Sequence, residues 1–154
     1  MNKDDASTTA LQRPTDFFTA DEIAYLRKVD SQRSWLAVAH CWAVIVGTWI
    51  VVSIFPNPIT ITLGVMIIGA RQLGLFVLTH DGAHGSLFKN RKLNDWVCEW
   101  ILNRPFTDEK IDNYRKYHVV HHANTQQEND PDLVLSKPFP ITKSSFRRKV
   151  IRDL

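Results

Sequence analysis

The fold is decided by WLAVAHCWAVIVGTWIVVSIF at Trp35–Phe55, the break Pro56-Asn57-Pro58, and ITITLGVMIIGARQLGLFVL at Ile59–Leu78. These segments fall largely within a run of 37 residues, 34–70, that contains no Asp, Glu, Lys or Arg. A helix of about 20 residues spans roughly 30 Å, which is the thickness of a bilayer core. Proline ends a helix because it lacks an amide donor. The stretch therefore predicts two transmembrane helices joined by a short turn, in an all-α membrane protein.

Two other interpretations of the apolar stretch are weaker. Core helices of a soluble bundle need a polar face, and an uncharged run of this length hardly supplies one. A cleaved signal peptide is disfavoured because the run begins late in the chain and a second apolar run follows it.

The remaining composition describes an ordinary single domain of 154 residues. With 44% hydrophobic and 23% charged residues, the chain is neither low-complexity nor disordered. Two cysteines exclude a multi-bridge secreted framework, and a net charge of +3 does not argue for a nucleic-acid partner. We expect an N-terminal cytoplasmic segment over 1–33, a transmembrane hairpin over 34–79 and a cytoplasmic part over 80–154.

The Lys and Arg residues are distributed unevenly around the hairpin. Five precede the first span, none lies in the turn, and 13 follow the second span. Because cytoplasmic segments of membrane proteins carry an excess of Lys and Arg, both termini are expected on the cytoplasmic side. A bacterial inner membrane is the expected location.

Capping signals predict further helices outside the hairpin. Thr19 and Glu22 form a capping box, and other Thr and Ser residues precede helical segments. The predicted elements are a membrane-surface helix over 20–30, an interfacial helix over 93–102, a helix from Thr107 to about Ala123, a loop over 125–140 and a basic amphipathic helix begun by Ser144.

Five of the six histidines fall in two clusters, HDGAH at His80–His84 and HVVHH at His118–His122. Residues three and four apart share one face of a helix, so each cluster presents its imidazoles together. Imidazole binds iron, zinc, copper and nickel. Five imidazoles exceed what one open site needs, which indicates two metals. A zinc hydrolase is a weaker interpretation, because Asp81 stands where such a helix has a longer Glu and the second cluster stays unexplained.

The two clusters and their surroundings resemble the integral-membrane fatty acid desaturases, and look most like the bacterial members. The resemblance rests on RQLGLFVLTHDGAHGSLFKNRKLNDW (71–96) and YRKYHVVHHANTQQENDPDL (114–133). The family's first two histidine boxes have the forms H-x-x-x-H and H-x-x-H-H, which these segments match.

The resemblance implies an oxidoreductase that desaturates fatty acyl chains with a non-haem centre of two irons and O₂ as co-substrate. The substrate would be a lipid, an acyl-CoA or an acyl carrier protein, and electrons would come from a ferredoxin or a small haem protein. Membrane hydroxylases and carotenoid ketolases share the boxes and remain an alternative. The implied ligands are His80, His84, His118, His121 and His122.

The family also has a third box, H-x-x-H-H, which does not occur among these 154 residues. We therefore expect the chain to be the N-terminal half of a desaturase domain that is inactive alone, with an inactive remnant as the other interpretation. Carboxylates of Asp81, Asp130 and Asp132 are expected to orient the imidazoles rather than to bind metal. For the acidic run over 128–132, a solvated loop remains open as an alternative.

Overall fold

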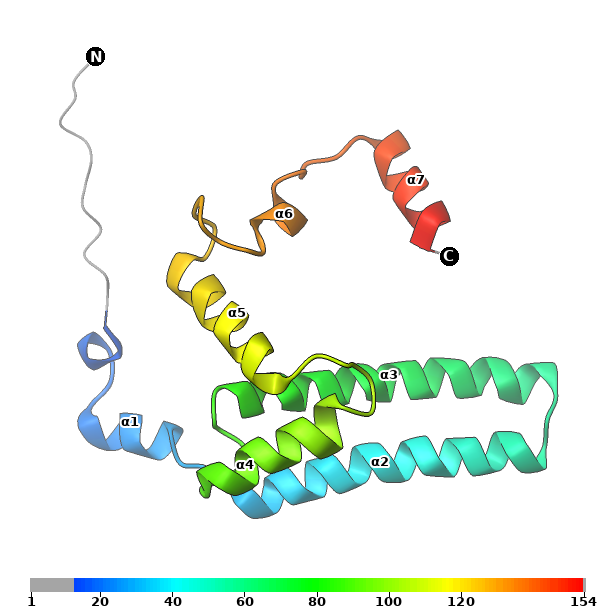
Figure 1. Cartoon of the computed structure of the whole chain (residues 1–154), viewed down its shortest axis with the longest axis horizontal. Helices are drawn as coiled ribbons and strands as arrows, with labels where there is room; N and C mark the ends of the chain where they lie inside the picture. The colour runs from blue at the N-terminus through cyan, green and yellow to red at the C-terminus, as the bar shows by residue number, and fades with distance from the viewer. Residues whose placement is uncertain (1–12, 154) are drawn as a thin grey trace.

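The computed structural model describes residues 13–153. All regular secondary structure in this part of the chain is helical, as predicted (Figure 1). Residues 1–12, which begin the predicted N-terminal segment, lie outside the described residues. The elements are η1 (Pro14–Asp16), α1 (Ala20–Leu26), α2 (Ser31–Ile54), α3 (Pro58–Ala83), α4 (Arg91–Val97), the π-helical turn η2 (Cys98–Asn103), α5 (Ile111–Asn124), α6 (Leu133–Ser136) and α7 (Lys143–Asp153).

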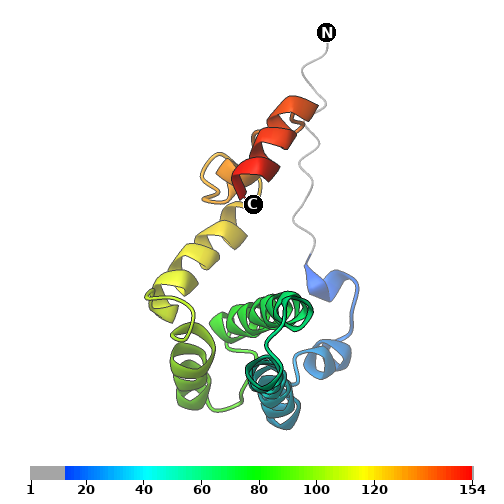
Figure 2. The same cartoon turned by 90° about the vertical axis from the view of Figure 1, so that its right-hand side faces the viewer.

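Helices α2 and α3 form the predicted antiparallel hairpin, side by side in both views (Figures 1 and 2). Asp30 begins α2, because its carboxylate accepts hydrogen bonds from the next free backbone amides. Asn57 does the same for α3, directly before Pro58 at the first helical position. The Pro-Asn-Pro segment therefore ends one helix and starts the next.

The apolar surface of the hairpin faces outward. In each of the two long helices, only 11% of the most apolar 18-residue stretch is buried within the chain. Large side chains such as Trp49, Ile54, Val65 and Met66 are exposed. A core helix of a soluble protein would be mostly buried, so this distribution fits helices that face lipid.

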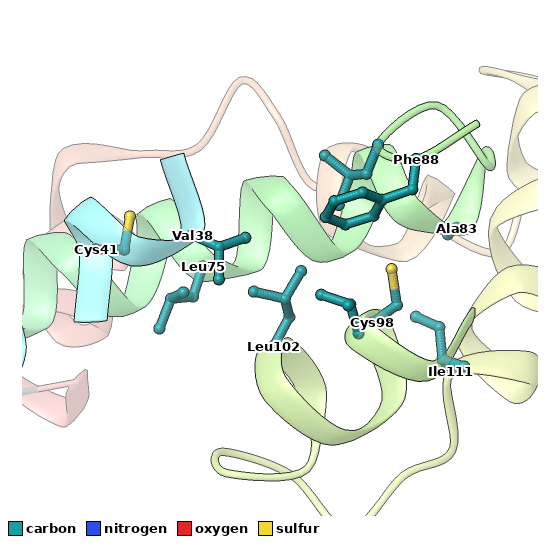
Figure 3. Packing of buried hydrophobic residues seen from close by; sticks show 10 residues of the cluster. Val38, Cys41, Leu75, Ala83, Phe88, Cys98, Leu102 and Ile111 are labelled. Carbon is teal, nitrogen blue, oxygen red and sulfur yellow. The ribbon is translucent and has the colours of Figure 1, made fainter. Parts of the chain in front are cut away.

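The buried core lies at one end of the hairpin, where α4 and η2 cross it. Figure 3 shows Leu75 of α3, Val38 of α2 and Leu102 of η2 close together, with Cys98 and Ile111 farther along the same cluster. All five side chains are buried. The best-packed part of the molecule is therefore the end of the hairpin that carries the first histidine cluster.

Several predicted boundaries are wrong. The helix predicted over 20–30 ends at Leu26, because Asp30 is used as the cap of α2. The helix predicted over 93–102 begins at Arg91 and changes to π-helical geometry from Cys98 to Asn103.

The caps and loop in the last third of the chain also differ from the prediction. Thr107 accepts a hydrogen bond from the Glu109 amide in a turn, and α5 begins only at Ile111. At the start of α7 the Ser145 amide donates a hydrogen bond to Oγ1 of Thr142, so Thr142 rather than Ser144 caps this helix. Within the predicted loop over 125–140 the chain forms the single turn α6.

Helix α5 leaves the α4 end of the hairpin at an angle, and α6 and α7 continue as an arm away from the hairpin (Figure 1). Helix α7 has the predicted amphipathic composition, with exposed Phe146 and Ile151 among basic residues. The site-bearing part of the molecule is thus the junction of α3, α4, η2 and α5.

Candidate metal centre

The first histidine cluster lies at the end of α3, which closes with a specific cap. The Ser86 amide donates to the Asp81 carbonyl and the Gly85 amide donates to the Gly82 carbonyl. Gly85 has φ of 74°, a left-handed conformation that glycine adopts without strain. This cap holds His80 and His84 on the last turn of α3.

The second cluster lies on α5, and the crossing of α5 with α3 brings four imidazoles together. Two come from each helix: His80, His84, His118 and His122. One ring nitrogen of each lies within 4.8 Å of the corresponding nitrogens of the others. Nε2 of His118 is 3.0 Å from Nε2 of His84 and 3.0 Å from Nε2 of His122.

These distances fit a shared metal ion better than hydrogen bonds alone. A ring nitrogen either donates one proton or offers one lone pair, so Nε2 of His118 can hydrogen-bond only one of its two neighbours. Imidazole nitrogens bind divalent metals such as zinc at about 2.0–2.1 Å, and two of them at right angles around one ion lie about 3.0 Å apart. The four imidazoles therefore fit a metal ion.

Burial and neighbouring rings favour the neutral form of two imidazoles in the cluster, His118 and His84. Burial and the neighbouring rings of His80, His122, His84 and His121 lower the pKa of His118 to about 4. Burial also lowers the pKa of His84, with further contributions from the His80 and His122 rings. Metal ligands must be deprotonated, so at neutral pH these two side chains are ready to bind.

His121 is placed differently from the other four. Its Nδ1 lies 2.8 Å from Oδ1 of Asp130 and 3.3 Å from Oδ2 of Asp132, and it is not a member of the four-imidazole group. The hydrogen bond to Asp130 raises the pKa of His121, against the effect of burial. Its role as a ligand stays a prediction.

Asp130 is not part of a solvated loop. Its side chain is buried and accepts hydrogen bonds from the Gln126 and Asp132 amides as well as facing His121. The His121 hydrogen bond lowers the pKa of Asp130, with the two amides contributing further, against desolvation. A carboxylate that holds one ring nitrogen of a histidine sets the orientation of the other. His121, Asp130 and Asp132 also bring ligand atoms within 4.8 Å of one another, a group that could itself hold a metal ion, so the orienting role of the carboxylates stays a prediction.

Other sequence candidates have smaller roles. Asp81 lies 3.3 Å from Nδ1 of His80, in a partly exposed pair. His40 is exposed on α2 and outside the four-imidazole group.

Sequence reasoning missed the residues that join the histidine helices. Arg115 of α5 donates to the Ala83 carbonyl and pairs with Asp95 of α4. Asn94 of α4 is fully buried and donates to the Gly82 carbonyl. The available signal was two adjacent polar residues, Asn94 and Asp95, inside the segment predicted as an interfacial helix.

Of the comparisons with known proteins, the one with family models found a match. Residues 56–154 match the family model described as fatty acid desaturase. The matched range includes α3 and both histidine clusters. No curated protein and no solved structure matches the chain.

Proposed function

Because the chain belongs to the fatty acid desaturase family, we propose that it uses a histidine-bound iron centre in the O₂-dependent desaturation of a fatty acyl chain. The family and the apolar hairpin indicate a membrane protein and an oxidoreductase of the desaturase or hydroxylase type. The convergence of four imidazoles from two helices is the observation that carries the proposal.

Each imidazole has a definite task in this proposal. His80, His84, His118 and His122 would hold iron, and His121 would complete the ligand set with Asp130 orienting its ring. Bound iron would supply O₂ activation and the removal of hydrogen from an unactivated C–H bond. The surrounding helices would hold the rings in place before the metal arrives.

A cavity beside the imidazoles supports an acyl substrate. It has a volume of about 340 Å³ and is lined by Phe76, Thr79, Leu102 and Tyr114 among others. Thr79 directly precedes His80, and the Tyr114 ring stacks on that of His118 with the ring centroids 5.3 Å apart. The lining also includes polar residues such as Gln72, Asn103 and Glu109. The apolar side chains Phe76 and Leu102 would place methylene groups near the reacting centre.

The partners and location follow from the same proposal. The acyl group would arrive as a lipid, an acyl-CoA or an acyl carrier protein, and a ferredoxin or a small haem protein would deliver electrons. The Lys and Arg distribution supports cytoplasmic termini in a bacterial inner membrane. Placing the imidazoles on that side would give soluble donors access to them.

The test measures unsaturated fatty acyl products in the lipids of the source cell, with the protein in its native full-length form. We expect His118→Ala to abolish the unsaturated product, because an open site cannot keep its geometry without this shared ligand. His40→Ala is the control and should leave the product near its normal level. A hydroxylated or oxo product in place of a double bond would support the related hydroxylase or ketolase chemistry. Normal desaturation by His118→Ala would contradict the metal centre.

A further inference from the structure

We propose that Arg115 is a positioning residue that sets the distance between the two histidine-bearing helices by binding the end of α3. The inference rests on the proposed metal centre. Arg115 touches neither the imidazoles nor the cavity, so its contribution would act through the helices.

The end of α3 offers a carbonyl oxygen that the helix cap does not use. The cap occupies the Asp81 and Gly82 carbonyls with backbone amides. Among the described residues, the Ala83 carbonyl accepts no backbone amide, and Nε of Arg115 donates to it at 2.9 Å. A free carbonyl at a helix C-terminus attracts a cation, because it carries the negative end of the helix dipole.

The guanidinium of Arg115 links its own helix, α5, to two other helices. Besides Ala83 of α3, its Nη2 pairs with Asp95 of α4 at 2.7 Å and its Nη1 with Asp112 of α5 at 2.6 Å. The side chain is only 20% exposed, so these contacts are partly shielded from water. The planar fork of arginine suits three fixed acceptors in a way that a lysine ammonium does not.

Asn94 supports the same junction from α4. It is 0% exposed, and its Nδ2 donates to the Gly82 carbonyl at 2.8 Å. Two consecutive carbonyls at the end of α3 thus accept side-chain donors, one from α4 and one from α5. This arrangement resists sliding of α5 along α3.

The contact of Arg115 with the Ala83 carbonyl, which we call the clamp, lies close in sequence to a metal ligand on both helices. Ala83 directly precedes His84, while Arg115 lies three residues before His118 and on the same face of α5. The imidazoles of His84 and His118 are those whose Nε2 atoms lie 3.0 Å apart. A shift of α5 by a fraction of an ångström would therefore change this ligand spacing.

The first test measures metal affinity of the full chain in lipid nanodiscs, with Co²⁺ as the probe and its visible absorption bands as the readout. Arg115→Gln should lower Co²⁺ affinity about 10- to 100-fold, as loss of an outer hydrogen-bond partner does at metal sites. Arg115→Lys should recover part of that loss, because it keeps the charge but not the fork. Affinities of Arg115→Gln and wild type that agree within twofold would overturn the proposal.

The matched control is Arg91→Gln. Arg91 pairs with the same carboxylate, Asp95, at 3.4 Å from a more exposed position. Its guanidinium packs against Gly85 in the α3 cap, but among the described residues it donates no hydrogen bond to an α3 carbonyl. We expect its Co²⁺ affinity to stay within twofold of wild type. An equal loss in both variants would show that charge near Asp95, rather than the α3 contact, matters, and would overturn the proposal.

The second test uses hydrogen exchange in the metal-free chain, so that it does not depend on the metal centre. Arg115→Gln should speed exchange at the amides of His84–Ser86 and at the start of α5, and leave α2 unchanged. If exchange also rises throughout α2, the Arg115→Gln variant is generally unfolded, and the exchange rates at His84–Ser86 and in α2 are then compared in the Arg115→Lys variant instead. Unchanged exchange at His84–Ser86 overturns the clamp, whereas a wild-type chain that binds no Co²⁺ overturns the proposed function instead.

Discussion

His118 is the buried member of the four imidazoles and is surrounded by other rings. His121, one turn away, faces the carboxylate of Asp130 instead. Burial and four other rings lower the pKa of His118 to about 4, whereas Asp130 raises the pKa of His121 from its ordinary value of 6.5. The pKa values of the two side chains are therefore shifted in opposite directions from 6.5. This contrast separates a ring that offers a lone pair from a ring held by a carboxylate.

We predict that NMR titration of the metal-free chain shows His118 protonating near pH 4 and His121 above pH 6.5. Asp130→Asn should move the His121 pKa back toward 6.5, since it removes the main partner. Asp132→Asn is the control and should move it less, because Asp132 is more distant at 3.3 Å. A His121 pKa unchanged by Asp130→Asn would contradict the pair.

The same shift of the His118 pKa makes folding pH-dependent. Between pH 6.5 and about pH 4, the unfolded chain carries a proton on His118 that the folded chain does not. The free energy of unfolding from this group therefore falls as the pH drops through that window. The His121 pKa has the opposite effect: its contribution is complete below pH 6.5 and disappears as the pH rises through the folded value.

Gly82 of α3 packs against Cys98 of η2, and we predict that Gly82→Ala destabilises the chain. A Cβ there would lie 1.9 Å from the Sγ of Cys98, which is fully buried. Overpacking of this kind costs about 1–3 kcal/mol. Thermal unfolding in detergent measures the loss. Gly69→Ala is the control and should be neutral or stabilising, because nothing lies within 4 Å of its added Cβ.

The double variant Gly82→Ala, Cys98→Ala tests the steric explanation. Removing the Sγ makes room for the new methyl group, so the pair should be more stable than the sum of the two single effects predicts. Strict additivity would mean that the Gly82→Ala loss has a cause other than this contact.

At the scale of the elements, the hairpin and the helices around its end have different structural roles. Helices α2 and α3 expose apolar side chains along their length and bury them only where α4 and η2 cross. Glu99 of η2 joins that crossing to α5, since it accepts the Ile111 amide at 2.8 Å and pairs with Arg104 at 2.7 Å. The hairpin thus anchors the chain, and the crossing helices place the second histidine cluster.

For the hairpin we predict a two-span topology with the turn on the periplasmic side. A cysteine introduced at Asn57 should react with a membrane-impermeant thiol reagent from outside the inner membrane, and one at Ser144 only after the membrane is opened. The native Cys41 and Cys98 are buried and should contribute little background. Release of the chain by alkaline carbonate, or external labelling at Ser144, would contradict this topology.

At the scale of the whole molecule, a metal ion would join parts of the chain that are far apart in sequence. His84 and His118 are separated by 34 residues, and the connection between them includes α4 and η2. A ligand that binds only the folded state stabilises it by an amount that rises with the logarithm of its concentration relative to Kd. The metal would therefore act as a crosslink between α3 and α5.

We predict that Co²⁺ at 100 times its Kd raises the free energy of unfolding by about 2.7 kcal/mol. The accompanying rise in Tm should be absent in His118→Ala and retained in His40→Ala. Limited proteolysis should show slower cleavage around α5 when Co²⁺ is present. Equal stabilisation of the His118→Ala variant would place the binding site elsewhere.

The sequence alone determined the helical class, the hairpin and the pairing of histidines within each cluster. These features follow from local rules: a charge-free run long enough to cross a bilayer, prolines between its halves, and spacings of three and four residues on a helix. They do not depend on which helix packs against which. The family resemblance rests on the same local patterns and was confirmed by the match over residues 56–154.

Only the tertiary structure decided how the two clusters meet. The crossing of α3 and α5 gathers His80, His84, His118 and His122, and the loop after α5 brings Asp130 to His121. It also gives Arg115, Asn94 and Gly82 their importance, because each contacts a helix distant in sequence. Spacing within one helix constrains the angle around its axis, but not the angle between two axes, which depends on side-chain packing such as that of Cys98 against Gly82.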